Sequence, residues 1–276
     1  MGKYLKKFET QSAYEAAQSS LILPNVSLTL DNNTVHYNPS TPPTPPTPTE
    51  TRLVCKYNVE DTSYATILCK YYDNFSAMEI DGVEQAEVVS SYQFDTIGEH
   101  TVKYTLTDPT TIGDDVFEQC DDLTSVTMPN SVITIGDYAF ANCYSLTRLN
   151  SEVDGVFNIP SGVTSIGDAA FSSAYFTSVT IPDSVITIGS GAFFCYDLTT
   201  VIIGSGITNM GNTVFDECSD LISVTILASV PPTIGYGVFN YNAYGRKIYV
   251  PSGSVNAYKT ASEEWETWAE DIEPIQ

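Results

Sequence analysis

The sequence is poor in basic residues. Lysine and arginine together number 11, against 34 aspartate and glutamate residues, and the formal net charge is −23. Nucleic-acid binding needs clustered cations that neutralise phosphates, and anionic lipid surfaces attract polybasic segments. We therefore expect neither nucleic acid nor an anionic membrane surface as a partner. The imbalance is strongest between Thr110 and Gly245, where fourteen acids accompany a single base, Arg148.

Histidine is scarce and long apolar runs are missing. The two histidines, His36 and His100, lie near no nucleophile motif. The GxSxG, HExxH and P-loop strings are absent, so we expect no enzymatic activity, no catalytic residue and no cofactor. No stretch approaches the ~18 apolar residues that a membrane-spanning helix requires. The start of the chain, Met1 to Thr10, is basic but lacks the apolar segment of a signal peptide.

Six cysteines raise the question of disulfides or a zinc site. Four of them occupy one repeated position, three residues before a leucine, and these are Cys120, Cys143, Cys195 and Cys218. Repeat-equivalent cysteines predict a buried ladder of small apolar side chains. No CxxC pair is present, so we expect no zinc or other metal. Cys55 and Cys69 lie on two adjacent predicted strands, where either a disulfide or two free thiols is possible.

A proline tract, Pro39 to Pro48, divides the chain. Proline fixes φ and lacks a donor N–H, so residues 39–50 are expected to form a semi-rigid polyproline II linker; a ligand for a proline-binding domain is the alternative. Residues 1–38 before the linker are predicted to contain a helix over 10–20 and a hairpin of 26–30 with 35–37. So few residues bury little surface, which predicts that residues 1–38 dock onto an assembly partner.

Residues 51–108 show the pattern of a small antiparallel β domain. Five strands are predicted, at 53–59, 65–71, 78–80, 92–94 and 100–106. Turn formers such as Asp81-Gly82 and Ile97-Gly98 separate them. This density of short strands is typical of a sandwich-like, immunoglobulin-like domain.

The remaining residues, 109–276, are repetitive. The string Ile-Gly-x-x-Ala/Val-Phe begins at Ile112, Ile135, Ile166, Ile188 and Ile234, and Met210 opens a sixth copy, at intervals of 23, 31, 22, 22 and 24 residues. Repeats this short cannot close a core alone and must stack on their neighbours, which indicates a solenoid.

Each repeated position has an expected role. Inward rungs of a parallel sheet are assigned to Val126, Val179, Val201 and Val224, and an aromatic spine to Phe117, Phe140, Phe171, Phe193, Phe215 and Phe239. The glycine after each isoleucine is expected to turn the chain with φ > 0. Pro129, Pro160 and Pro182 are expected to end strands, because proline cannot donate to a ladder.

These six copies resemble the BspA-like leucine-rich repeats of gut and oral bacteria, over roughly Pro109 to Pro274. The resemblance implies a mainly β, right-handed leucine-rich repeat solenoid of about six repeats of 22–24 residues, one longer. The closing segment around Trp265 and Trp268 also resembles that family's C-terminal cap. The family implies surface-displayed adhesion to host proteins or cells, with no shared catalytic residues. The opening module resembles the start of structural proteins from gut bacteria and their phages.

A binding face is predicted on the outward strand positions, which are mostly small hydroxyl residues. The candidate residues are Ser125, Thr127, Arg148, Asn150, Ser178, Thr180, Thr200, Ser223 and Thr225. The second copy is about eight residues longer than the others, with residues 151–158 inserted near its strand. Insertions in solenoids often map to a loop on the binding face; neutral length variation is the alternative.

Two functions follow from these patterns. The first is a non-enzymatic adhesin at the cell surface or outside the cell, whose solenoid binds a protein or glycan. The second is a structural component of a phage virion, docked by residues 1–38. The repeat family favours the first, and the small module before a stiff linker favours the second.

Overall fold

The computed structural model describes residues 26–31, 34–39 and 52–275. The chain divides into two compact units, Met1–Thr49 and Glu50–Gln276. The predicted helix over 10–20 and the proline linker, apart from Pro39, lie outside the described residues.

The first unit contains a β-hairpin. Strands β1 (Val26–Asp31) and β2 (Thr34–Pro39) pair antiparallel, with Asp31 opposite Thr34. In the sequence, Asn32 and Asn33 lie between the two strands. The hairpin predicted from the alternating pattern is confirmed.

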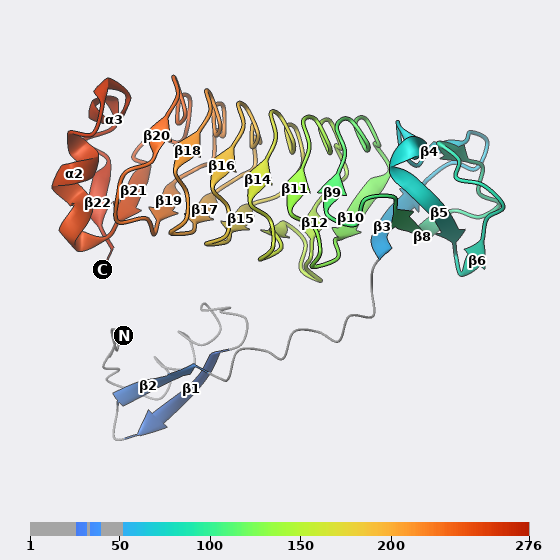
Figure 1. Cartoon of the computed structure of the whole chain (residues 1–276), viewed down its shortest axis with the longest axis horizontal. Helices are drawn as coiled ribbons and strands as arrows, with labels where there is room; N and C mark the ends of the chain where they lie inside the picture. Colours follow the sequence, from blue (N-terminus) through green and yellow to red (C-terminus); the bar gives the residue numbers. More distant parts are fainter. Residues whose placement is uncertain (1–25, 32–33, 40–51, 276) are drawn as a thin grey trace. The chain divides into compact units, whose positions relative to one another are not determined.

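The second unit is a solenoid built on two sheets that run along the repeats (Figure 1). The parallel part of the twelve-stranded main sheet consists of β10 (Leu123–Thr127), β12 (Arg148–Leu149), β13 (Val156–Asn158), β15 (Ser178–Ile181), β17 (Thr200–Ile203), β19 (Ser223–Ile226), β21 (Lys247–Val250) and β22 (Ile272–Pro274). The second sheet consists of β9 (Thr111–Ile112), β11 (Thr134–Ile135), β14 (Ser165–Ile166), β16 (Thr187–Ile188), β18 (Asn209–Met210) and β20 (Thr233–Ile234).

Residues 52–106 close one end of the solenoid. The main sheet continues through β3 (Arg52–Val59), β8 (Gly98–Leu106), β5 (Phe75–Ile80) and β6 (Val83–Glu84), while β4 (Thr66–Ile67) and β7 (Ser91–Tyr92) form a separate pair and η1 (Tyr72–Asn74) precedes β5. The strands are antiparallel, as predicted. They are not set apart as the expected 51–108 domain would be, because β3 pairs with β10 and residues from both regions share one core.

The reason for this continuity is the open end of the first repeat. A solenoid end exposes apolar rungs and an unpaired strand edge unless another element covers them. Here Phe75 and Tyr104 pack against Phe117, with ring centroids 5.8 and 5.7 Å apart. Residues 52–106 therefore act as an N-terminal cap.

The phenylalanine spine holds the repeats together. The six rings predicted for it are all buried, and successive rings stack nearly parallel at centroid distances of 5.1, 5.4, 5.5, 5.5 and 5.8 Å. The predicted valine rungs are also buried. Val179, Val201 and Val224 lie in register, and Val126 joins them through Leu149 and Phe157.

The repeated cysteines form the expected buried ladder. The thiol of Cys143 donates to the Phe117 carbonyl of the preceding turn at 3.0 Å, and Cys218 donates to the Phe193 carbonyl at 3.1 Å. Burial raises the pKa of both thiols to about 12, which keeps them protonated and unreactive. In the last repeat Asn242 takes this place and donates to the Phe215 carbonyl at 2.7 Å.

Cys55 and Cys69, whose pairing the sequence left open, are both buried free thiols. Cys55 lies inside β3, and the thiol of Cys69 donates to the Val89 carbonyl at 3.7 Å. Burial raises the pKa of Cys69 to about 12.

The glycine after each repeated isoleucine has a different role from the one expected. Its φ is not positive; instead, a Cβ on Gly167 would lie 2.5 Å from the backbone nitrogen of Asp137 in the preceding turn. The left-handed residue comes two positions later, for example Ala169 at φ 50° and Gly191 at φ 62°. Glycine is therefore required for the close approach of adjacent turns, and the expectation of a φ > 0 turn at this position was wrong.

The insertion in the second copy adds a strand. Residues 156–158 form β13, which lies between β12 and β15 in the main sheet, whereas β11 and β14 remain direct neighbours in the second sheet. Phe157 on β13 fills the added space and stacks on Phe176 at 3.9 Å. The spine is undisturbed, so the extra length is absorbed on one side of the solenoid.

The C-terminal cap predicted around two tryptophans is present. Helices α2 (Val255–Lys259) and α3 (Glu263–Thr267), with η2 (Ser252–Ser254), cover the last repeat. Trp265 is buried and its indole N–H donates to the Pro232 carbonyl at 2.8 Å. Arg246 donates to the Phe239 carbonyl at 2.6 Å and to Asp271 at 2.6 Å, which satisfies the end of the spine.

We predict that Phe193→Ala lowers the free energy of unfolding by about 3–5 kcal/mol, because it empties one rung of a closely packed spine. Urea denaturation of the full chain measures this. Tyr244→Ala, at a fully exposed tyrosine, is the control and should change stability by less than about 0.5 kcal/mol. A loss below about 1 kcal/mol for Phe193→Ala would contradict the spine.

We predict that Gly167→Ala destabilises the fold more than Gly191→Ala. The first substitution forces a Cβ into the backbone of the neighbouring turn, at a cost of about 2–3 kcal/mol. In Gly191→Ala the added Cβ meets no atom within 4 Å. The only cost is that alanine must adopt the left-handed conformation, which lowers the free energy of unfolding by about 1 kcal/mol. Thermal and urea unfolding of both variants compare the two costs, and the reverse order would refute the close-approach role.

Candidate functional site

The outer face of the main sheet holds the predicted binding residues. Ser178, Thr180, Thr200, Ser223 and Thr225 all lie on the strands β15, β17 and β19. Side chains alternate between the two faces of a strand, and the intervening valines are buried, so these five point outward.

Strand register brings these five residues together in two rows. Ser178 lies opposite Thr200, which lies opposite Ser223, and this is the first row. In the second row Ile202 stands between Thr180 and Thr225. The two rows form a flat surface of small, mostly hydroxyl side chains, which we call the hydroxyl face.

Arg148 and Ser125 lie outside the hydroxyl face, toward the N-terminal cap. Arg148 forms ion pairs with Glu99 at 3.6 Å and with Asp154 of the insertion at 3.3 Å, and Lys56 also pairs with Glu99 at 2.9 Å. The hydrogen bond from Lys56, reinforced by the charges of Lys56 and Arg148, lowers the pKa of Glu99. Ser125 is buried beside this network. Arg148 therefore ties the cap to the repeats.

Asn150 and Thr127 complete the predicted set. Asn150 follows β12 with a φ of 47°, accepts a hydrogen bond from the Met128 N–H at 2.8 Å and donates to the Asn158 carbonyl at 3.2 Å. Asn150 therefore links the insertion to the end of β10 in the first copy, and its side-chain amide is engaged in these contacts. Thr127 is exposed at the end of β10.

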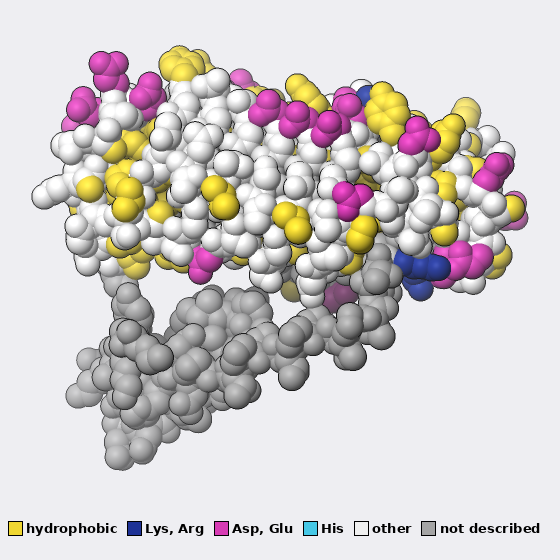
Figure 2. All heavy atoms as spheres, viewed as in Figure 1, with side chains coloured by type: hydrophobic (Ala, Val, Ile, Leu, Met, Phe, Trp, Pro, Cys, Tyr) yellow, Lys and Arg dark blue, Asp and Glu magenta, His cyan; other side chains and the backbone are white. Residues whose placement is uncertain are grey.

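The surface of the repeats is acidic. Between Leu149 and Gly245 the sequence has eight acids and no lysine, arginine or histidine. On the face drawn in Figure 2, acidic side chains are spread along the repeats and the visible basic ones lie near the end that carries the N-terminal cap. Lys247 on β21 and Lys259 on α2 lie at the other end of the unit. Some acids also support the fold: Asp137 accepts a hydrogen bond from the Asp168 N–H at 2.7 Å, and Asp168 accepts one from the Ser190 N–H at 2.5 Å.

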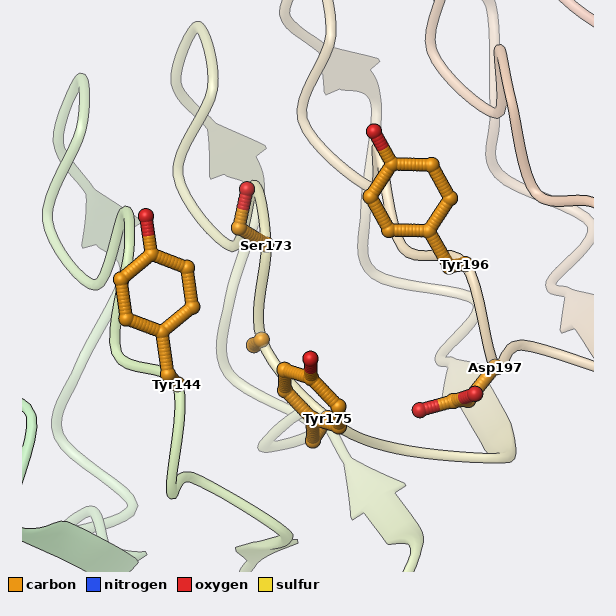
Figure 3. Close-up of a pocket in the computed structure, with 6 residues that line it drawn as sticks. Tyr144, Ser173, Tyr175, Tyr196 and Asp197 are labelled. Carbon is orange, nitrogen blue, oxygen red and sulfur yellow. The ribbon is translucent and has the colours of Figure 1, made fainter.

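A second surface is a shallow hollow on the turns that lead from the second sheet to the main sheet (Figure 3). We call it the tyrosine hollow, and it is lined by Tyr144, Ser173, Ala174, Tyr175, Tyr196 and Asp197. The three tyrosines come from three successive repeats and are 52%, 48% and 50% exposed. Each ring therefore contacts the protein on one side and is open on the other.

The hollow arises from an irregularity in the third copy. Where the second copy reads Cys143-Tyr-Ser-Leu146, the third reads Ala174-Tyr-Phe176 and is one residue shorter. Phe176 is buried and takes the place of the leucine, and Ser173, Ala174 and Tyr175 of this shorter turn line the hollow between Tyr144 and Tyr196. The hollow was not predicted from the sequence, although a tyrosine follows the cysteine position in three successive copies, at Tyr144, Tyr175 and Tyr196.

The rim of the hollow is polar and negatively charged. The Tyr144 hydroxyl donates to Asn142 and the Tyr196 hydroxyl donates to Glu217, each at 3.4 Å. Partial burial and the charge of Glu217 raise the pKa of Tyr196. Open aromatic faces beside carboxylates suit the binding of a ligand, and the lining contains no nucleophile paired with a base.

Among the described residues, no group of three or more His, Cys, Asp and Glu side chains is placed to hold a metal ion. Within the same residues, no helix is both long and apolar enough to cross a bilayer.

Three solved structures are similar to parts of this chain. A leucine-rich repeat protein from Bacteroides ovatus ATCC 8483 is 24% identical over 53% of this chain and 47% of its own, with a TM-score of 0.37. The leucine-rich repeat protein of T. pallidum is 25% identical over 62% and 81%, with a TM-score of 0.41. A leucine-rich cell surface protein from Faecalibacterium prausnitzii A2-165 is 25% identical over 60% and 57%, with a TM-score of 0.33. The chain thus spans about half the length of the first of these proteins.

No curated protein matches the chain significantly. The family model for the BspA type leucine-rich repeat region matches it in six copies, over residues 87–156 and 155–262. These residues make up more than half of the sequence. They contain the stacked turns from β9 to β21, and also β7 and β8 of the N-terminal cap. The chain therefore belongs to the BspA-type leucine-rich repeat family.

Proposed function

We propose that this protein is a non-enzymatic binding protein that presents its hydroxyl face to protein or glycan ligands at the cell surface or outside the cell. The observation that carries the proposal is the alignment of Ser178, Thr200 and Ser223, with Thr180 and Thr225 beside them, on three adjacent strands. A repeat family gives a scaffold, and binding belongs to the surface displayed on it.

The chemistry of the hydroxyl face favours many weak contacts. Hydroxyl groups both donate and accept hydrogen bonds, so the face can match the hydroxyl groups of a glycan or the backbone of a protein. The face spans three adjacent strands of one sheet, so a ligand would contact several side chains at once. Strength would then come from several copies of the protein acting together on one surface, because linked sites raise avidity without new contacts.

We also propose that the two units have separate tasks. Residues 1–38 serve as the docking module, 39–50 as the linker, 51–108 as the N-terminal cap region and 109–276 as the repeats. The hairpin of β1 and β2, set in its own unit before the proline tract, favours a second candidate function. In that case the protein is a structural component of a phage virion, anchored by residues 1–38.

We expect the double substitution Thr200→Arg with Thr225→Arg to weaken ligand capture about tenfold or more, because two long cations cover the centre of the hydroxyl face. Beads coated with the full chain are incubated with arrays of extracellular-matrix proteins and of glycans, and the retained signal is compared with that of the unaltered protein. The substituted side chains point outward, so the melting temperature should stay unchanged.

The matched control is Asn209→Arg with Thr208→Arg, which adds the same two charges at exposed positions on and beside β18 of the second sheet. The control should retain capture. If both double variants lose capture equally, the effect comes from charge alone. If neither loses it, the hydroxyl face is not the binding surface.

Deletion of residues 1–38 tests the docking module. We expect the shortened protein to keep the unfolding temperature of the repeat unit, since residues 50–276 form a compact unit with a core of their own. It should also keep ligand capture and lose attachment to cells or particles. Unchanged attachment and an unchanged oligomeric state, measured by sedimentation, would show that residues 1–38 have no docking role.

A further inference from the structure

The tyrosine hollow lies on the turns between the two sheets, so it is a different surface from the hydroxyl face. Figure 3 shows Tyr144 and Tyr196 standing apart, with Tyr175 and Ser173 from the turn between them. Along the phenylalanine spine, the same three turns are spaced 5.4 and 5.5 Å apart. The two outer tyrosines belong to turns about 11 Å apart by that measure, and Ser173, Ala174 and Tyr175 of the turn between them form the rest of the lining.

The aromatic rings supply one half of the recognition. Each of the three tyrosines has about half of its surface exposed, and an exposed ring face carries the negative part of the aromatic quadrupole. A cation placed over such a face is attracted to it. Tyrosine is also enriched among the residues that contribute most to binding at protein interfaces.

The charges supply the other half. Asp197 lines the hollow and is exposed, and Glu217 accepts the hydrogen bond of Tyr196 at its rim. The backbone N–H of Asp220 donates to the Tyr196 carbonyl at 3.4 Å, which places the backbone of a third acidic residue beside Tyr196 in space. The nearest basic residues in the sequence are Arg148 and Arg246, and Arg148 is engaged by Glu99 and Asp154.

We infer that the tyrosine hollow binds an arginine side chain displayed by a partner protein. The guanidinium group would lie against the exposed face of Tyr175 or Tyr196, and Asp197 would accept its hydrogen bonds. Arginine fits better than lysine because its planar group stacks on aromatic rings and also pairs with a carboxylate through two parallel hydrogen bonds. Anionic ligands are disfavoured by the same acids.

This inference does not depend on the hydroxyl face. The two surfaces share no residue, so a variant of one should leave the other intact. The hollow would give a specific anchor for a cationic loop, whereas the hydroxyl face offers many interchangeable contacts.

The test uses the full chain and a short probe, the peptide acetyl-Gly-Arg-Gly-Arg-Gly-amide. Binding is followed by nuclear magnetic resonance on protein with isotope-labelled tyrosine rings. The ring signals of Tyr144, Tyr175 and Tyr196 should shift, and those of the exposed Tyr236 and Tyr244 should not. A peptide with citrulline for arginine has the same shape without the charge and should cause no shift, and the lysine peptide should bind more weakly.

Substitutions separate the hollow from the general acidity of the chain. Tyr196→Leu and Asp197→Asn should each weaken binding of the arginine peptide about two- to fivefold, and 0.5 M salt should weaken it further. The matched controls are Tyr236→Leu and Asp168→Asn, which remove an exposed ring and a carboxylate elsewhere on the repeats. Both controls should leave the affinity unchanged.

Three results would overturn the inference. Equal binding of the citrulline peptide would show that charge is not recognised. Equal losses for Asp168→Asn and Asp197→Asn would reduce the effect to net charge. A shift of the three tyrosines by a neutral oligosaccharide such as cellohexaose, without any by the arginine peptide, would assign the hollow to a glycan. Capture of matrix proteins and glycans is measured on the same variants. If capture is retained while arginine binding fails, only this inference is wrong. If capture itself fails in the unaltered protein, the proposed function is wrong.

Discussion

The stacking of each turn on the one before it is the interaction on which the rest of the structure depends. A repeat of 22–24 residues buries almost nothing alone, so its rings, thiols and strands find partners only in neighbouring turns. The phenylalanine rings lie 5.1 to 5.8 Å apart along the whole spine. That spacing forces glycine where two backbones meet, as at Gly167, and lets each buried thiol reach the carbonyl of the turn before.

Stacking also creates the need for caps. The first and last turns each have one side without a neighbour, and the chain covers both. At one end Phe75 and Tyr104 pack on the spine, and β3 pairs antiparallel with the otherwise open edge of β10. At the other end Trp265 and Arg246 close the spine and satisfy its last carbonyls. The caps thus belong to the same cooperative unit as the repeats.

The surfaces offered for binding have two different origins. The hydroxyl face follows from regularity, because equivalent positions of β15, β17 and β19 fall side by side in a parallel sheet. The tyrosine hollow lies at an irregularity, because the third copy is one residue shorter in the turn that carries Tyr175. The extra strand β13 is another irregularity, and it takes up Arg148 and Asn150 in structural contacts.

The sequence by itself determined the solenoid, its spine and its rungs, because a repeated pattern places equivalent residues at equivalent heights. The C-terminal cap was expected from the resemblance of the closing segment to that of the repeat family. It also predicted the outward strand positions of Ser178, Thr180, Thr200, Ser223 and Thr225, since strands alternate with a period of two. Ser125, which was predicted for the same face, is buried instead. Only the tertiary structure decided the role of Gly167, the fate of residues 156–158 and the joining of β3 to β10. It alone also placed Tyr144, Tyr175 and Tyr196 around one hollow. These features depend on the distances between neighbouring turns and on where the chain places inserted or missing residues. The repeat pattern specifies neither, because both are set by packing between turns.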